Sequence, residues 1–359
     1  MQVYLSSISM GLVTFVIVAI LLTIPFSIFQ YRKYGYINKW RTLIIFSFIL
    51  YCLCAYYLVI WPLPSTRDVQ SLQTEATQHL QLVPFTFVRQ LIEGPYYSSG
   101  LGLIKDIFLS RVFLQAFFNI LLLVPMGFFL KYLFNRNWYQ VLIISFLISL
   151  FFELTQLSGL YGYYNAPYRI FDVDDLFLNT LGGLQGVGFY HLVQTVLPDW
   201  KKLDRNLDLN EKPISGFRRI LAYMIDTFLF SIVVGFIVGN TSTIEGELLI
   251  ALCYAFVLYL TNGKSFGLWL TRLRVVEVEQ KKLTLKAALI RCGIFFLYAI
   301  PTYLLQMLYD MERTTLIAAV VSVLRLVYLG LLLFYFVGMY LLRKKYLHEK
   351  LSRTKTIIS

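Results

Sequence analysis

The chain has 359 residues, of which 58% are hydrophobic and only 14% are charged, whereas soluble domains carry about 25% charged residues. Apolar residues occur in runs of about 20, the length that a helix needs to cross the hydrocarbon core of a bilayer. The backbone amides of such runs must be hydrogen-bonded within helices, because the bilayer core holds no water. The composition therefore excludes a soluble protein and predicts an all-α polytopic membrane helix bundle.

About nine membrane spans are predicted along the chain. The first lacks the basic region and small-residue cleavage site of a signal peptide, so we interpret it as a true span. The seventh is short for a helix that crosses a bilayer. The spans are expected at residues 10–30, 41–61, 112–134, 139–158, 174–197, 219–239, 247–262, 289–309 and 315–342.

The net charge of +12 follows the connections between these spans. Of the 32 Lys and Arg residues, 25 lie in alternate connections and 6 in the opposite ones, and Arg325 lies inside the last span. Basic residues favour cytoplasmic connections, so the N-terminus is expected outside and the C-terminus in the cytoplasm of a bacterial cell membrane. This distribution indicates contacts with membrane lipids and no nucleic-acid partner.

The polar stretch 198–213 separates two predicted membrane domains, residues 1–197 and 214–359, and is interpreted as a cytoplasmic linker. A second long connection, residues 62–111, holds four prolines and is expected to form an outer cap or a re-entrant segment. The four cysteines and three histidines show no metal-binding spacing. We therefore expect no metal and no cofactor.

Polar residues gather at the predicted outer ends of the fourth and fifth spans. Glu153 and Gln156 share one helix face, and a carboxylate inside a span costs about 2.5–3.5 kcal/mol unless it is paired or hydrated. Arg169 is the nearest cation in the sequence, so a Glu153–Arg169 pair is expected. The remaining candidates of this cluster are Asp172, Asp175, Asn179 and Asn119.

Part of this pattern has a purely structural interpretation. Asp172 and Asp175 resemble a helix N-terminal capping box. Gln156 suits a bond to a neighbouring helix, and Gly182 with Gly186 is the small-residue spacing that lets membrane helices approach closely.

The order of these residues resembles the VanZ-like membrane proteins over about residues 41–197. Their pattern, roughly N-x5-P-x-G, E-x-x-Q and R-x-x-D-x-x-D-x-x-x-N-x-x-G, fits FFNILLLVPMGFFL, FELTQ and RIFDVDDLFLNTLGG. The resemblance implies reduced susceptibility to glycopeptide antibiotics, especially teicoplanin and lipid-tailed relatives. It implies no molecular mechanism.

The second half resembles the RDD family over about residues 215–357. The motifs are GFRRILAYMID, with Arg219 and Asp226, then GKSFGLWLTRLRVV and YLHEKLSRTK, where Glu349 stands at a position that is usually Asp. Asp226 is either a proton- or cation-responsive group or the partner of Arg325 in a structural ion pair. Residues 264–291 are expected to form an interfacial turn and a basic amphipathic segment.

The leading hypothesis is a resistance protein that engages a lipid-linked cell-wall precursor, or a lipoglycopeptide antibiotic, at the outer leaflet. An intramembrane enzyme that modifies an envelope lipid through carboxylate chemistry is one alternative. A small-solute or ion transporter that uses the RDD-like half is another. Whether a reaction is catalysed stays open at this point, because no Ser-His or Cys-His pairing is legible.

Overall fold

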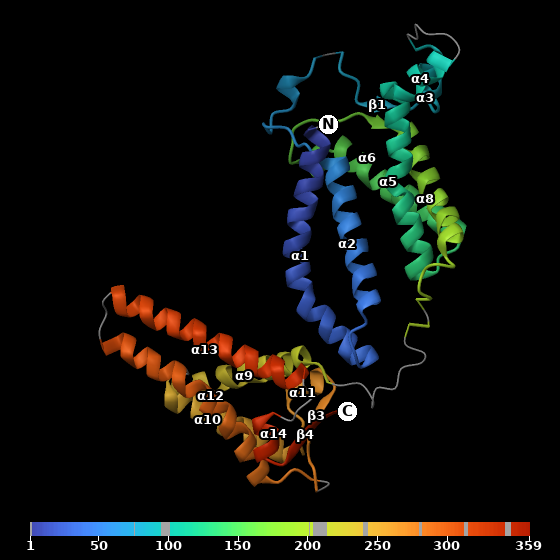
Figure 1. Ribbon diagram of the computed structural model, residues 1–359. Coiled ribbons are helices and arrows are strands. Elements are labelled where there is room, and N and C mark those ends of the chain that lie inside the picture. The colour runs from blue at the N-terminus through green and yellow to red at the C-terminus, as the bar shows by residue number, and fades with distance from the viewer. Residues whose placement is uncertain are drawn as a thin grey trace. The chain divides into compact units, whose positions relative to one another are not determined.

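The protein is described by a computed structural model (Figure 1). It describes residues 2–74, 76–94, 101–200, 202–203, 214–239, 243–279, 282–311, 315–341 and 346–359. These residues are mainly helical, which confirms the expected all-α class of a polytopic membrane protein. The orientation in the membrane and the domain limits 1–197, 198–213 and 214–359 stay predictions, and much of the linker (204–213) lies outside the described residues.

The contacts divide the chain into two compact units. The first unit comprises residues 1–23 and 38–206, and the second comprises residues 24–37 and 207–359. The helix α1 (Gln2–Tyr34) contributes to both, because its last turns pack with the second half of the chain. Each unit is therefore described by itself.

The first unit continues with four long helices joined by short elements. The long helices are α2 (Lys39–Ile60), α5 (Arg111–Phe134), α6 (Trp138–Leu157) and α8 (Val173–Val193). The short elements are η1 (Gln70–Leu72), β1 (Leu80–Gln81), α3 (Thr86–Ile92), α4 (Leu101–Leu109), the turn α7 (Gly159–Gly162) and β2 (Phe171–Asp172).

Helix α8 packs so closely against α5 that the backbones of the two helices are in contact. A Cβ atom added to Gly182 would lie 1.9 Å from the carbonyl oxygen of Ile120, and one added to Gly186 would lie 2.1 Å from that of Val124. The two glycines thus let α5 and α8 approach as the small-residue spacing predicted. This close approach brings the polar positions of both helices within hydrogen-bonding range.

The second unit is a helical bundle with a small antiparallel ladder. Its helices are α9 (Gly216–Val238), α10 (Ile244–Leu260), α11 (Phe266–Leu270), α12 (Leu285–Met311), α13 (Thr315–Leu341) and α14 (Leu347–Leu351). Strand β3 (Leu273–Glu277) pairs antiparallel with β4 (Thr354–Ile358), with Leu273 opposite Ile358.

Strand β3 lies within residues 264–291, where a turn and a basic amphipathic segment at the membrane interface were expected; the interfacial position stays a prediction. Leu273 and Val275 of β3 are fully buried in a core shared with α9, α10 and α12. Gly263, whose φ is +84°, brings its backbone so close to Val275 that a Cβ there would lie 1.8 Å from the Val275 carbonyl oxygen. The segment is a packed structural element because its alternating apolar residues have a core to enter.

Helices occur at all nine predicted spans. Within the described residues, seven helices are long and apolar enough to cross a membrane, judged by length and composition. The two remaining predicted spans correspond to α8, which carries Asp174, Asp175 and Asn179, and to α10, which has 17 residues. The chain is accordingly a multi-pass membrane protein.

Candidate functional site

The polar candidates of the first unit come together where α6 ends and α8 begins. Glu153 is 3% exposed, and its Oε2 accepts a hydrogen bond from the Asp172 backbone N–H at 3.0 Å. The Asp172 carboxylate in turn accepts from the Asp174 N–H at 2.8 Å and caps α8. Burial, reinforced by the Asp174 charge, raises the pKa of Asp172, although the bond from the Asp174 N–H opposes the shift.

A second set of contacts ties α5, α6 and α8 beneath that cap. The Asn119 amide donates to the Asp175 carboxylate. The Asn179 amide donates at 2.9 Å to the Ser149 hydroxyl, which itself donates to the Asp175 carbonyl at 3.3 Å. The Asn179 Oδ1 and the Ser145 hydroxyl are buried without a hydrogen-bond partner among the described residues. Asn119, Asp175 and Asn179 therefore lie in one polar region between α5, α6 and α8, in which Asn179 is buried.

Arg169 has a different partner from the one expected. Its guanidinium donates to the carbonyls of Val59 at 2.8 Å and Trp61 at 3.0 Å, and the Gln156 amide also donates to Val59 at 2.8 Å. The carbonyls at a helix C-terminus lack partners within the helix and carry partial negative charge, so the end of α2 attracts this cation. The expected Glu153–Arg169 ion pair is therefore wrong, although both residues lie in the same cluster.

Asp174 is a residue of this region that sequence reasoning left out of the site. Its carboxylate is buried and accepts from the backbone N–H groups of Phe85 at 2.5 Å and Phe87 at 3.0 Å. It thereby holds the start of α3 against α8, while β1 pairs in parallel with β2. The acidic run DVDD was the available signal, but a partner 89 residues away could not be read from it.

The charge of the cluster is unbalanced. Four carboxylates lie at this end of α6 and α8, belonging to Glu153, Asp172, Asp174 and Asp175. None of them takes part in an ion pair within the part of the chain that the structure describes. Arg169 is the cation whose charge acts on both Glu153 and Asp175. The cluster is thus a partly desolvated group of carboxyls that would be stabilised by a cation or by protons.

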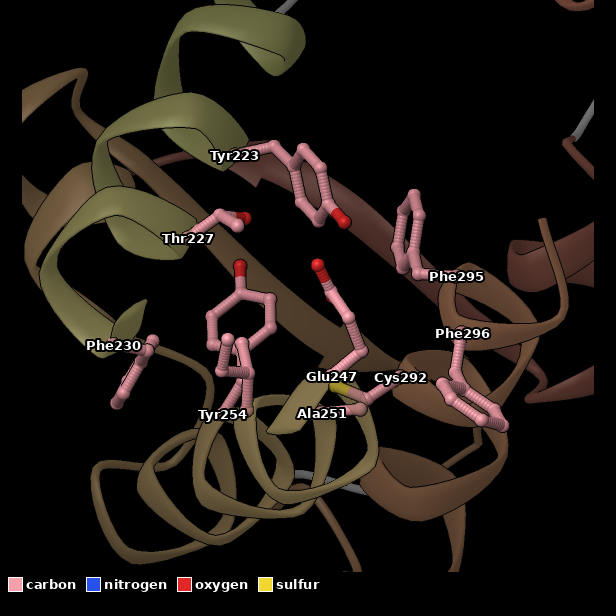
Figure 2. A pocket seen from close by; sticks show the side chains of 10 residues that line it. Tyr223, Thr227, Phe230, Glu247, Ala251, Tyr254, Cys292, Phe295 and Phe296 are labelled. Carbon is pink, nitrogen blue, oxygen red and sulfur yellow. The ribbon is translucent and has the colours of Figure 1, made fainter. Parts of the chain in front are cut away.

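Asp226 of the second unit anchors a loop. It is 1% exposed, its Oδ1 accepts from the Gly267 N–H at 2.7 Å, and the Ser265 hydroxyl donates to its other oxygen. The Tyr254 hydroxyl also faces this carboxylate and lines a pocket between α9, α10 and α12 (Figure 2). These contacts correct the expected Asp226–Arg325 pair, because the carboxylate is held by the start of α11.

Two family models match consecutive parts of the chain. Residues 48–194 match the VanZ/LLP1 model, and residues 215–353 match the RDD family model. The chain joins a VanZ-like domain to an RDD domain. All seven candidate residues of the first unit lie within the VanZ-like match, although their functional role stays a prediction. Neither a curated protein nor a solved structure matches the chain significantly.

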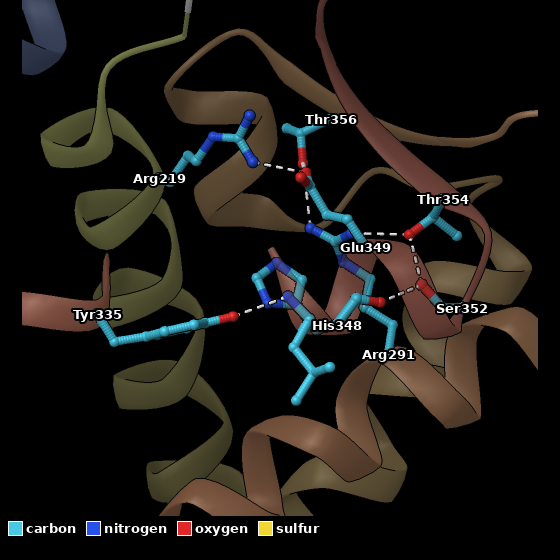
Figure 3. Close-up of polar contacts among 9 residues, drawn as sticks. Arg219, Arg291, Tyr335, His348, Glu349, Ser352, Thr354 and Thr356 are labelled. Carbon is cyan, nitrogen blue, oxygen red and sulfur yellow. Dashed lines mark hydrogen bonds and ion pairs between the residues drawn. The ribbon is translucent and has the colours of Figure 1, made fainter. Parts of the chain in front are cut away.

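The RDD domain holds its C-terminal segment through a polar network (Figure 3). The Glu349 Oε1 accepts from Arg219 at 2.5 Å and from the Thr356 hydroxyl at 3.1 Å. Arg291 donates to the hydroxyls of Thr354 at 2.8 Å and Thr356 at 3.0 Å. Glutamate therefore reaches the arginine of α9 from the position where the family usually has aspartate, and Arg219 and Asp226 serve separate contacts.

The His348 side chain lies beside this network, whereas its backbone carbonyl accepts a hydrogen bond from the Ser352 hydroxyl (Figure 3). Its ring lies 4.5 Å from that of Phe295 and stacks on Tyr346, and its Nδ1 has no hydrogen-bond partner among the described residues. Burial, together with the positive charges of Arg291 and Arg219, lowers the pKa of His348 to about 2. The side chain is neutral at physiological pH and packs as an aromatic ring.

Sequence reasoning missed the network because its members are scattered over four segments. Arg291 lies at the start of the predicted span 289–309 and was not among the candidate residues. The alternation of Thr354 and Thr356 with exposed residues was a weak strand signal. Neither feature could identify a partner on another helix.

Proposed function

We propose that this protein lowers the susceptibility of a bacterium to glycopeptide antibiotics of the teicoplanin type. In this proposal the VanZ-like domain engages the lipid-tailed drug, or a lipid-linked cell-wall precursor, at the outer leaflet of the cell membrane. The observation that carries the proposal is the concentration of four carboxylates against one guanidinium at the ends of α6 and α8. The match of residues 48–194 to the VanZ/LLP1 model supports the biological setting.

The contacts favour the carboxylates over Arg169 as the groups that meet a ligand. Arg169 already donates to two carbonyls of the α2 end, so recognition of a phosphate by this side chain loses support. Glu153 accepts one hydrogen bond, from the Asp172 N–H, through a single oxygen, and Asp175 accepts one from Asn119. Each carboxylate keeps acceptor capacity for a positively charged group of the ligand.

The test is gene deletion in the native host, followed by complementation with wild type or single variants. Glu153→Gln and Asp175→Asn each replace one carboxyl group by an amide and keep the side-chain size. Glu93→Gln is the matched control, because Glu93 is an exposed carboxylate of the same domain that pairs only with the exposed Arg89. Membrane abundance is measured by immunoblot, and inhibitory concentrations are measured for teicoplanin-type drugs and vancomycin.

Deletion is expected to sensitise the cells mainly to the lipid-tailed drugs. Wild type and Glu93→Gln restore resistance, whereas Glu153→Gln and Asp175→Asn do not at equal abundance. If deletion changes the susceptibility to neither drug class, the resistance proposal fails. If the two cluster variants rescue as well as wild type, resistance does not depend on the anionic cluster.

A further inference from the structure

The RDD domain contains a pocket that has no role in the site proposed above. It lies between α9, α10 and α12. The residues that give it chemical character are Tyr223, Thr227, Glu247, Tyr254, Phe295 and Phe296. Figure 2 shows the Glu247 carboxylate and the hydroxyls of Thr227 and Tyr254 directed into the same space.

Aromatic rings form the walls around these oxygens. The rings of Tyr223 and Phe295 stack with their centroids 4.9 Å apart, and Phe230 and Tyr254 lie 5.5 Å apart. The faces of such rings carry partial negative charge, so they attract a cation that is removed from water. The aromatic rings and the oxygen atoms therefore both favour a positively charged ligand.

Glu247 is the one charged group that lines the pocket, and no Lys or Arg is among the lining residues. Among the described residues Glu247 forms no ion pair, and its charge acts on the Tyr303 hydroxyl of α12. Arg291 is a nearby cation whose charge acts on Tyr254. Its guanidinium donates hydrogen bonds to the hydroxyls of Thr354 and Thr356 in β4. A half-buried carboxylate without a cation is costly, and an incoming cation would offset that cost.

The oxygen atoms that line the pocket determine which type of cation it favours. A hard metal ion such as Ca²⁺ needs 6–8 oxygen ligands, and no group of three His, Cys, Asp or Glu side chains able to hold a metal occurs in the described part of the chain. A primary ammonium needs only a few acceptors for its three N–H groups. Glu247, Thr227 and Tyr254 supply such acceptors beside aromatic walls.

We propose that this pocket binds a primary ammonium group carried on a small apolar body, with Glu247 as its counter-ion. The Tyr223 and Phe295 rings contact the ammonium and the adjoining carbon atoms. The ammonium belongs either to a free amine or to the ethanolamine headgroup of a lipid, because both present the same chemistry. This inference is independent of antibiotic resistance and concerns the RDD domain alone.

The experiment uses the full chain in nanodiscs of phosphatidylcholine, which has no primary amine. Isothermal titration with n-butylammonium is compared with titrations of n-butanol and sodium chloride at constant ionic strength. Only n-butylammonium is expected to bind saturably. Equal binding of sodium, or binding of n-butanol with the same affinity, overturns the proposal.

Two variants of α10 isolate the counter-ion. Glu247→Gln is expected to raise the Kd for n-butylammonium by about tenfold or more, since it removes a desolvated charge partner. Glu245→Gln removes the other carboxylate from the same first turn, outside the pocket lining, and leaves the Kd unchanged within a factor of about two. An equal loss in both variants would mean that general charge, and not the pocket, attracts the amine.

A substitution in the aromatic wall, Phe295→Leu, provides a second test in case Glu247→Gln misfolds. Phe295→Leu keeps the carboxylate and removes one ring, so weaker binding of n-butylammonium is expected at unchanged monodispersity on gel filtration. Unchanged affinity in Phe295→Leu overturns the aromatic part of the proposal. Nanodiscs with added phosphatidylethanolamine then identify the source: a raised apparent Kd for n-butylammonium supports a lipid headgroup, and an unaltered Kd supports a free amine.

Discussion

Replacing Gly182 by alanine is expected to separate α8 from α5. The new Cβ would lie 1.9 Å from the Ile120 carbonyl oxygen, whereas ordinary contact begins near 3.4 Å, so the atoms must move apart by about 1.5 Å. The oxygen belongs to the backbone of α5 and cannot rotate away as a side chain would. The helices must therefore shift as units, which also strains the neighbouring Asn119–Asp175 contact.

Overpacking of this kind costs about 1–3 kcal/mol. For a domain of this size a change of 1 kcal/mol moves the melting temperature by about 2–4 °C. Gly188→Ala is the matched control, because it lies on the same helix and its Cβ would meet nothing within 4 Å. Alanine there improves helix propensity by up to about 1 kcal/mol, so the control is expected to be neutral or slightly stabilising.

The free cysteines allow a melting assay that reports on the first unit alone. Cys52 and Cys54 lie on α2, and Cys253 and Cys292 belong to the second unit. In a Cys253→Ala/Cys292→Ala background, a thiol-reactive fluorophore follows α2, which contacts α5 through the Tyr51–Leu122 bond. Gly182→Ala is expected to melt several degrees below its parent. Equal melting of Gly182→Ala, Gly188→Ala and the parent would refute the close-approach reasoning.

Two further predictions concern the RDD domain. An unfolded His348 protonates near pH 6.5 and the folded one only near pH 2, so stability is fully present above pH 6.5 and falls by about 1.4 kcal/mol per pH unit below it. In scanning fluorimetry at pH 7.5 and 5.5, His348→Phe should lose part of this acid dependence, and an unchanged slope contradicts the assignment. Glu349→Gln is expected to destabilise the domain by about 1–3 kcal/mol, because Arg219 keeps its charge without a carboxylate; a melting temperature equal to that of wild type would show that the pair contributes little.

The spans and the shared helix face of Glu153 and Gln156 could be predicted because both depend on short-range patterns. Apolar runs of bilayer length determine the helices, and Glu153 and Gln156 share a face through helix geometry alone. The partner of Arg169 could not be predicted in this way. Its acceptors, the carbonyls of Val59 and Trp61, lie about 110 residues earlier in the chain, and every helix end offers similar carbonyls.

The β3–β4 ladder was missed for a related reason. Each strand has five residues, and the two lie some 80 residues apart. In isolation β3 reads as a short amphipathic piece with basic residues, which also fits an interfacial segment. Only the buried positions Leu273 and Val275 distinguish the two structures, and their burial depends on α9, α10 and α12.

The carboxylates of this protein differ in the hydrogen-bond donors that they accept from. This difference distinguishes carboxylates with a structural role from candidates for ligand binding. Asp174 accepts from two backbone N–H groups of the α3 start, and Asp226 accepts from that of Gly267, so both hold backbone in place. Asp175 accepts from the Asn119 side chain, and Glu247 faces an aromatic pocket. Glu153 lies between these cases, because it accepts from the Asp172 N–H through one oxygen. A glutamine at position 153 can still accept that bond through its own carbonyl oxygen. Glu153→Gln therefore removes the carboxyl group and keeps an acceptor for the start of α8, so at equal abundance its phenotype reports on binding rather than on folding.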